Sequence, residues 1–261
     1  LKGTSTMAVT PRTTVAKAKT TLPANMDAMF AQDVEALRER LQVPTGDRIK
    51  IDNKQFKLPN GETLDFLDIV IVDYVHANRF YDSIYDKTKI VPPACFSTNA
   101  HPVDMVSSPN SPEPQATDCS SCPQNQFGTA GKGKACKNRI LMAILPTDAT
   151  VMTPFTILDI SPTAVKGFIA YTNSVAKGLG RPPYGVVTHV ECNKALKEDV
   201  AVFSDPIKIE DSDFILMLRG RLEEARARLL VDPDLTGYDA PQANKLPAPR
   251  TSARRPAAAR K

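Results

Sequence analysis

Four of the five cysteines in this 261-residue chain lie between residues 95 and 136, and thiolates are preferred ligands of zinc. Cys119 and Cys122 are separated by two residues, and Cys136 follows after thirteen more. A CxxC pair on a tight turn presents both sulfur atoms to one metal ion. The spacing therefore predicts a structural zinc site that includes Cys119, Cys122 and Cys136.

The fourth ligand of this site is expected nearby, and two residues compete for the position. Cys95 lies in the apolar segment PPACF, before the aperiodic stretch that contains the other three cysteines. Binding by Cys95 together with Cys136 would join both ends of that stretch to the body of the protein. His101 is the alternative, but it lies in a proline-rich loop, so Cys95 is the favoured fourth ligand.

Other uses of the cysteines are less well matched to the sequence. Ordinary buried thiols are the main alternative to a zinc site. Nothing signals secretion, which disfavours disulfides, and the spacing differs from the common iron–sulfur patterns. A zinc ion held by four thiolates has no open position for water, and the chain contains no recognisable catalytic motif. The sequence therefore predicts a protein that is not an enzyme.

A basic, glycine-rich loop lies between Cys122 and Cys136, in the sequence QFGTAGKGK. Lysines on such a loop can follow a phosphate backbone, and an adjacent aromatic ring can stack on a base. A solvated surface loop is the alternative interpretation. Together with the polar and aromatic end of an expected strand, this loop defines the candidate nucleic-acid-binding residues: Arg79, Tyr81, Tyr85, Phe127, Lys132, Lys134, Lys137 and Arg139.

Charge is distributed unevenly along the chain. Residues 1–20 and 241–261 carry ten lysines and arginines and no acids, whereas residues 21–240 carry a net charge of −6. We expect residues 1–21 and 241–261 to be disordered basic tails, which attract polyanions or only improve solubility. No apolar stretch approaches the length of a membrane span. A cytoplasmic location is expected, although the basic start of the sequence has some features of a transit peptide.

The elements between the tails mix helices and strands. Periodic apolar residues predict a helix at residues 26–41, and Ser161-Pro162 at one end with Gly178 or Gly180 at the other delimit a second helix. A single long helix is expected at residues 211–230. Strands are expected in a hairpin over residues 47–64 that turns at residues 59–61, and at residues 67–82, 140–145, 153–160, 184–192 and 200–209.

This order predicts an α+β fold with a mainly antiparallel sheet. Residues 22–240 would form one domain, with flanking helices and a zinc insertion at about residues 92–138. A barrel of the oligonucleotide-binding (OB) type is the specific architecture that we expect.

Five segments carry a resemblance to a known group of proteins: LPANMDAMFAQDVEAL, IKIDNKQFKLPNGE, IVIVDYVHANRFYD, PPACF and CSSCPQNQFGTAGKGKACKNR. They resemble uncharacterised phage-encoded proteins that look like distant relatives of phage single-stranded DNA-binding proteins. The similarity runs from about residue 22 to residue 235. It implies an OB barrel and a role in phage DNA replication or recombination in the host cytoplasm. The basic C-terminus departs from that pattern, because such proteins usually end in an acidic tail.

Two functions follow as hypotheses. The first is a zinc-stabilised protein that binds single-stranded DNA, with replication or recombination proteins as further partners and possible homo-oligomers. The second is a zinc-containing protein-interaction module that binds or inhibits a host enzyme. The basic loop and tails favour the first, and the acidic body favours the second.

Overall fold

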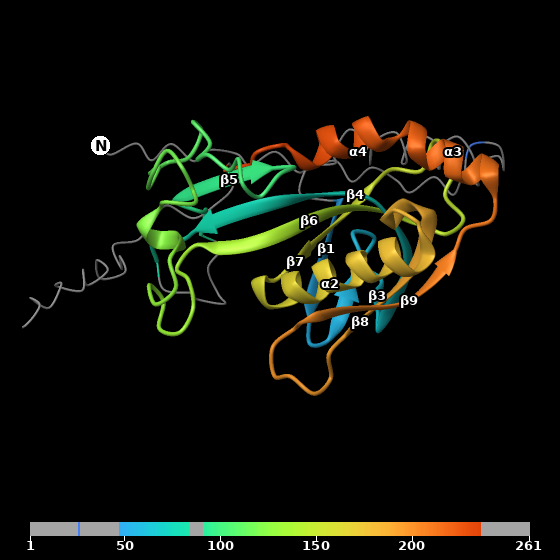
Figure 1. Ribbon diagram of the computed structural model, residues 1–261, viewed down its shortest axis with the longest axis horizontal. Coiled ribbons are helices and arrows are strands. Elements are labelled where there is room, and N and C mark those ends of the chain that lie inside the picture. Colours follow the sequence, from blue (N-terminus) through green and yellow to red (C-terminus); the bar gives the residue numbers. More distant parts are fainter. Residues whose placement is uncertain (1–25, 27–46, 84–90, 236–261) are drawn as a thin grey trace, which may run out of the picture. The chain divides into compact units, whose positions relative to one another are not determined.

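The computed structural model describes residues 26, 47–83 and 91–235 of the chain. Residues 1–43 and 44–261 separate into two units, and the elements described below all belong to the second. The expected helix at residues 26–41 lies outside the described residues, apart from Met26. The described part is α+β, with three helices and one strongly curled, mostly antiparallel sheet (Figure 1).

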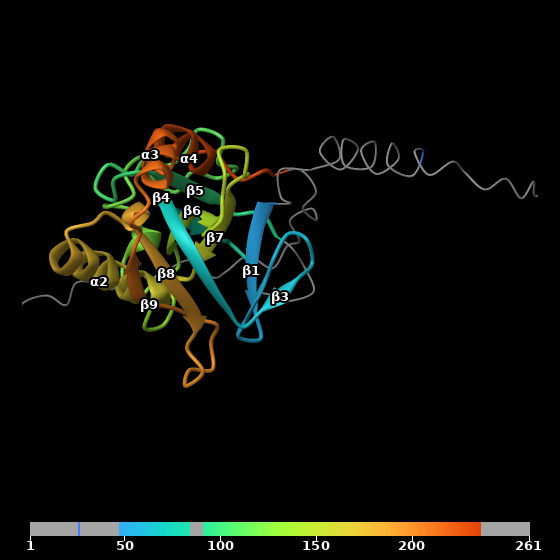
Figure 2. The same ribbon diagram turned by 90° about the vertical axis from the view of Figure 1, so that its right-hand side faces the viewer.

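The sheet is organised around one long strand, β4 (Phe66–Phe80). β4 pairs with β6 (Lys137–Pro146) along one edge. Along its other edge it pairs first with β8 (Val186–Cys192) and then with the short β5 (Cys95–Asn99). Because one strand spans both ends of the sheet, β4 connects the curled part of the sheet to the cysteine-containing insertion (Figure 1). Figure 2 shows the curled end, where β4 lies between β8 on one side and β1 on the other.

The remaining strands extend the sheet on both sides. β7 (Thr156–Ile160) pairs with β6, and β9 (Ala201–Lys208) pairs with β8. β1 (Arg48–Asp52) adds to β7 in parallel, followed by β2 (Gln55–Lys57) and β3 (Thr63–Leu64). Lys54 in the β1–β2 turn contacts Asp199 in the β8–β9 loop, which bridges the two ends of the curled sheet.

Both faces of the sheet are covered by helices. α2 (Pro162–Leu179) packs on one face, against a core that includes Ile71, Met142 and Phe203. α3 (Ser212–Gly220) and α4 (Leu222–Leu229) pack on the other face, over Val75 and Leu141. Since apolar side chains fill both faces, β4 and β6 are apolar at nearly every position of their central segments.

A bulge in β4 explains how its side chains are distributed between the two faces. The pairing with β6 shifts between Ile71 and Asp73, so the alternation of faces changes there. After the bulge, Val75 and Ala77 face α4, whereas Tyr74 packs against the core under α2. The same alternation then puts Arg79 on the α4 side and Asn78 on the α2 side.

Several expected elements differ from those observed. The turn at residues 59–61 is present, but it joins β2 to β3, and a second turn at Asn53-Lys54 joins β1 to β2. Both residues of that second turn have positive φ. The single helix expected at residues 211–230 is interrupted at Arg221, where the chain bends between α3 and α4. α2 begins and ends as predicted, with Ser161 as N-cap and Gly180 in the left-handed conformation as C-cap.

The cysteine-containing insertion is less irregular than the sequence suggests. β5 lies within residues 92–138, where no strand was expected, and pairs with the end of β4. Beyond the sheet, Ser108 Oγ donates to Asp232 Oδ2 at 2.7 Å, and Asn110 Nδ2 donates to the same oxygen at 2.8 Å. The insertion is therefore attached both to β4 and to the segment that follows α4.

Candidate metal and nucleic-acid sites

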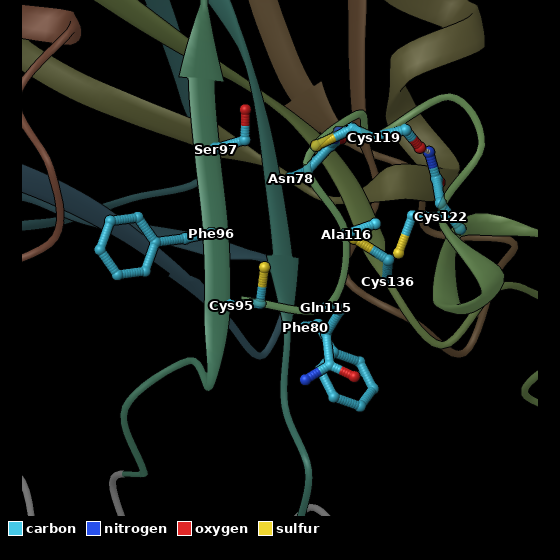
Figure 3. A pocket seen from close by; sticks show the side chains of 11 residues that line it. Asn78, Phe80, Cys95, Phe96, Ser97, Gln115, Ala116, Cys119, Cys122 and Cys136 are labelled. Carbon is cyan, nitrogen blue, oxygen red and sulfur yellow. Dashed lines mark hydrogen bonds between the residues drawn. The ribbon is translucent and has the colours of Figure 1, made fainter. Parts of the chain in front are cut away.

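Cys95, Cys119, Cys122 and Cys136 line one small pocket at the end of β4, and all four are buried, free thiols (Figure 3). The pocket has a volume of about 10 Å³, close to the space that one water-sized sphere occupies. The fold thus brings the four predicted ligands to one place, from β5, from the loop that follows it and from the residue just before β6. The fifth cysteine, Cys192, is buried at the end of β8 within the core under α2.

Two walls of different character enclose this pocket. One wall belongs to the sheet, where Phe80 of β4 pairs with Cys95 of β5, and Asn78 pairs with Ser97. The other wall is the segment of residues 119–136, which we call the finger. Cys119 and Cys122 lie at the start of the finger, and a short 3-10 turn at Pro123–Asn125 follows them. Cys136 closes the finger immediately before β6.

The thiols influence one another. Burial raises the pKa of Cys136 to about 12, with further contributions from Cys119, Cys122 and Cys95. Burial also raises the pKa of Cys119, and the neighbouring polar side chains of Ser97 and Asn78 act in the opposite direction. Thiols with raised pKa values stay protonated at neutral pH unless a nearby cation stabilises the thiolates. A soft divalent cation is the kind of ligand that this donor set fits.

The thiols are not drawn together as metal ligands. Among residues 47–83 and 91–235, no three Cys, His, Asp or Glu side chains form a coordinating group. In Figure 3 the sulfur atoms lie around a shared space, Cys95 on the strand side and Cys122 and Cys136 on the finger side. His101 does not line the pocket. It follows β5 at the end where His76 pairs with Asn99, four ladder positions away from the Phe80–Cys95 pair.

The finger ends in an exposed basic loop. Gly128 and Gly131 have positive φ, and backbone hydrogen bonds between Ala130 and Gly133 close a tight turn with Lys132 at its tip. Phe127 is 80% exposed, and the Lys134 ammonium lies 5.0 Å from the centre of its ring. An apolar ring is held in solvent beside one lysine, with a second lysine at the tip of the same loop, and this combination suits nucleobase stacking and phosphate contact.

The two candidate arginines, Arg79 and Arg139, lie on the side of the sheet that faces away from the finger. Arg79 and Arg139 both pair with Asp159 of β7, at 3.2 and 2.6 Å, and the three side chains are 14–27% exposed. These residues face α4, whereas the finger packs on the side of Asn78 and Asn138. Strand alternation therefore places these two arginines on the opposite side of the sheet from the finger.

The remaining candidates are Lys137, Tyr81 and Tyr85. Lys137 pairs with Arg79 across the β4–β6 ladder, but its ammonium donates to the carbonyl oxygen of Lys134 in the finger. Lys137 thus lies between the two sets of cations. Tyr81 is half-buried just after β4, and Tyr85 lies outside the described residues. Asp159 was not singled out in the sequence, since its pairing with two arginines depends on strand order.

Comparisons with protein-family models, with curated proteins and with solved structures find no match to this chain. In the part of the chain that the structure describes, no helix is long and apolar enough to cross a membrane.

Proposed function

We propose that the protein binds single-stranded DNA and that a structural zinc ion, held by Cys95, Cys119, Cys122 and Cys136, fixes the finger that contacts the strand. The observation that carries this proposal is the exposed Phe127 ring with Lys134 beside it and Lys132 at the loop tip. Exposed phenylalanines are costly to solvate, and a ring flanked by cations fits a partner that combines stacked bases with phosphates.

The proposed zinc site accounts for the burial of four thiols in a pocket of ionic size. When bound, zinc would supply a cross-link between β5, the knuckle at Cys119–Cys122 and the start of β6. Four thiolates leave no coordination position for water, so its role would be structural. The finger is rich in turns and has little apolar core of its own, which is typical of a segment that a metal stabilises.

The sheet topology also supports a barrel of the OB type. Apart from the short β5 and a 3-10 turn in the insertion and a 3-10 turn before β8, the chain order from β4 onward is β4, β6, β7, α2, β8 and β9, and the first of these strands pairs with both the second and the fourth. An OB barrel has this arrangement of five strands, and its loop between the first two strands is a common nucleic-acid contact. In this protein that loop contains the cysteine insertion. The resemblance to phage proteins points the same way, to DNA replication or recombination.

The coverage of both sheet faces limits where a strand could lie. In many OB barrels the outer face of the second and third strands is open, but here α4 covers β6 on that face. The proposed contact surface is therefore the finger, with Phe127, Lys132 and Lys134 at its centre and Lys137 beside it. Arg79 and Arg139 would extend it only around the end of β6.

A titration of single-stranded and duplex oligonucleotides at several salt concentrations tests the proposal. Phe127→Ala should weaken single-strand binding by roughly 1–3 kcal/mol at every salt concentration, because stacking depends little on counterions. The double change Lys132→Ala with Lys134→Ala should weaken binding mainly in dilute buffer and reduce the salt slope. Wild-type affinity in both variants, at unchanged zinc content, would refute the proposal.

A protein-interaction module is the alternative, and one observation favours it. Val103 and Val106, on the same insertion, are 76% and 58% exposed, and apolar residues at a surface are more typical of protein interfaces than of phosphate contacts. If Phe127→Ala and the double lysine variant bind DNA like the wild type, the protein-interaction module replaces single-stranded DNA binding as the proposed function. Val103→Ser with Val106→Ser would then be the variant to compare for loss of a protein partner.

A further inference from the structure

A network of side-chain amides connects the cysteine pocket to the basic loop, and Asn125 is at its centre. Asn125 Nδ2 donates to the carbonyl oxygen of Cys119 at 2.7 Å. Its Oδ1 accepts from Lys134 Nζ at 3.2 Å and from Asn138 Nδ2 at 3.0 Å. Asn125 also lines the pocket itself, so one side chain touches the site of the thiols, the loop and β6.

The network continues into the sheet. Asn138 Nδ2 also donates to Asn78 Oδ1 at 2.5 Å, and these two residues are direct partners in the β4–β6 ladder. Asn78 is buried, donates through Nδ2 to Met105 Sδ at 3.3 Å, and lines the pocket together with Cys119. The amide of Asn125 is thereby oriented from the rigid side of the pocket, and it transmits that orientation to Lys134.

Lys134 is the cation that lies over the Phe127 ring. A continuous series of contacts thus runs from Cys119 through Asn125 and Lys134 to Phe127. Within the described residues, the Lys134 ammonium contacts only the Asn125 amide and the exposed ring, and the ring alone cannot fix its position. The position of the basic loop therefore depends on a residue whose own placement depends on the thiol cluster.

We propose that Asn125 is a positioning residue that couples metal binding at the four cysteines to the placement of Lys134 and Phe127. This inference rests on the proposed function. A metal that fixes the Cys119 backbone would fix Asn125 and reduce the disorder that a bound strand must remove. Zinc and single-stranded DNA would then each strengthen the binding of the other by the same factor.

The first experiment measures the loop without DNA. Trypsin cleaves after Lys132 and Lys134, so its rate there reports how well the loop is held. We compare full-length wild type, Asn125→Ala and Gln126→Ala, each with zinc and after chelation. Gln126 is a matched control, because its amide donates to the carbonyl oxygens of Ser120 and Cys122 in the same knuckle, whereas Lys134 donates to Asn125.

Zinc should slow cleavage of the wild type and of Gln126→Ala by about tenfold, and of Asn125→Ala by less than about twofold. Elemental analysis should find equal zinc in all three proteins, because the substitutions are expected to change the position of the loop and leave the metal site intact. Equal protection of Asn125→Ala and wild type by zinc would overturn the coupling role of Asn125. Equal loss of protection in both variants would overturn its specificity, because the knuckle as a whole would then be responsible.

The second experiment measures zinc affinity by competition with a chelator, in low salt, with and without a single-stranded oligonucleotide. The oligonucleotide should strengthen zinc binding about fivefold or more in the wild type and leave it unchanged in Asn125→Ala. If the oligonucleotide binds the wild type equally well with and without zinc, the coupling is wrong, whereas the proposed single-strand binding itself stands. If no protein binds the oligonucleotide, the proposed function fails, and the trypsin rates alone decide the role of Asn125.

Discussion

Phe80 of β4 lies directly opposite Cys95 of β5 in the antiparallel ladder, and both side chains line the cysteine pocket. Phe80, Ala94, Cys95 and Cys136 form a small apolar cluster of their own, separate from the two large cores. The pocket is therefore built half on a rigid strand pair and half on a turn-rich finger. This asymmetry determines what loss of each cysteine should do.

Loss of a finger cysteine should remove the metal. We expect purified wild-type protein to contain about one zinc per chain, and Cys119→Ser or Cys136→Ser to contain little, because two or three thiolates hold zinc much more weakly than four. Elemental analysis measures the content. Cys192→Ser, which removes the thiol outside the pocket, is the matched control and should retain full zinc. Stoichiometric zinc in Cys122→Ser would exclude this site.

The fourth ligand can be assigned by comparing two variants. Cys95→Ser should lower zinc affinity strongly, and His101→Ala should leave it unchanged, because Cys95 lines the pocket and His101 does not. Chelator competition distinguishes them. In Cys95→Ser the finger loses its metal-mediated link to β5, so residues 119–136 should also become more protease-sensitive. The opposite ranking of the two variants would assign the position to His101.

The cysteine spacing predicts which thiols gather in one pocket, because CxxC geometry is local and each end of the insertion has one further cysteine.

The sequence does not show in the same way which face of the sheet each side chain of β4 occupies. The bulge between Ile71 and Asp73 changes the alternation of β4, and only the pairing with β6 reveals it. The sequence does not predict β5 because CFSTN is short and follows closely after two prolines. Its strand character comes from pairing with β4. The break at Arg221 has a tertiary cause, since its guanidinium stacks on Phe155 and donates to the Thr153 carbonyl oxygen.

Removal of the basic tails should weaken DNA binding without changing selectivity. Deleting residues 1–20 and 241–261 removes ten positive charges. Under the proposed function, affinity should fall most at about 50 mM salt and the salt slope should flatten, because fewer counterions are released. Fluorescence anisotropy with one labelled oligonucleotide over a salt series gives both quantities. Identical curves for the truncated and full-length chains would show that the tails take no part.

His76 should make stability depend on pH. Burial and the neighbouring His101 lower the pKa of His76 from its ordinary value of 6.5, and Tyr74 contacts its ring. The unfolded chain then binds more protons than the folded chain in acid. The contribution is complete above the unfolded pKa and is lost as pH falls through 6.5 towards the lower folded value.

The melting temperature should therefore decline as the pH is lowered from about 7 to about 5, and less steeply in His76→Gln. His189→Gln is the control, because His189 is paired with Asp68 on a different part of the sheet. Parallel declines in His76→Gln and wild type would assign the pH dependence to other groups.

Asp159 limits the net positive charge on the α4 side of the sheet. Its carboxylate pairs with both Arg79 and Arg139, so the three side chains together carry one net positive charge. Asp159→Asn would leave two arginines without their anion. Unfolding free energy should fall by about 1–3 kcal/mol, because the partly buried guanidinium groups lose charged hydrogen bonds.

Under the proposed function, the effect of the same change on DNA binding should show where the strand lies. If the bound strand reaches around the end of β6, Asp159→Asn should strengthen binding at low salt and steepen the salt slope by about one, through one further phosphate contact. If the strand is confined to the finger, affinity should be unchanged while stability still falls. Lys57→Ala, which breaks an exposed pair with Asp52 far from the finger, is the control for general effects of charge. A steeper slope in Asp159→Asn that disappears in Asp159→Asn with Arg79→Ala would place a phosphate next to Arg79.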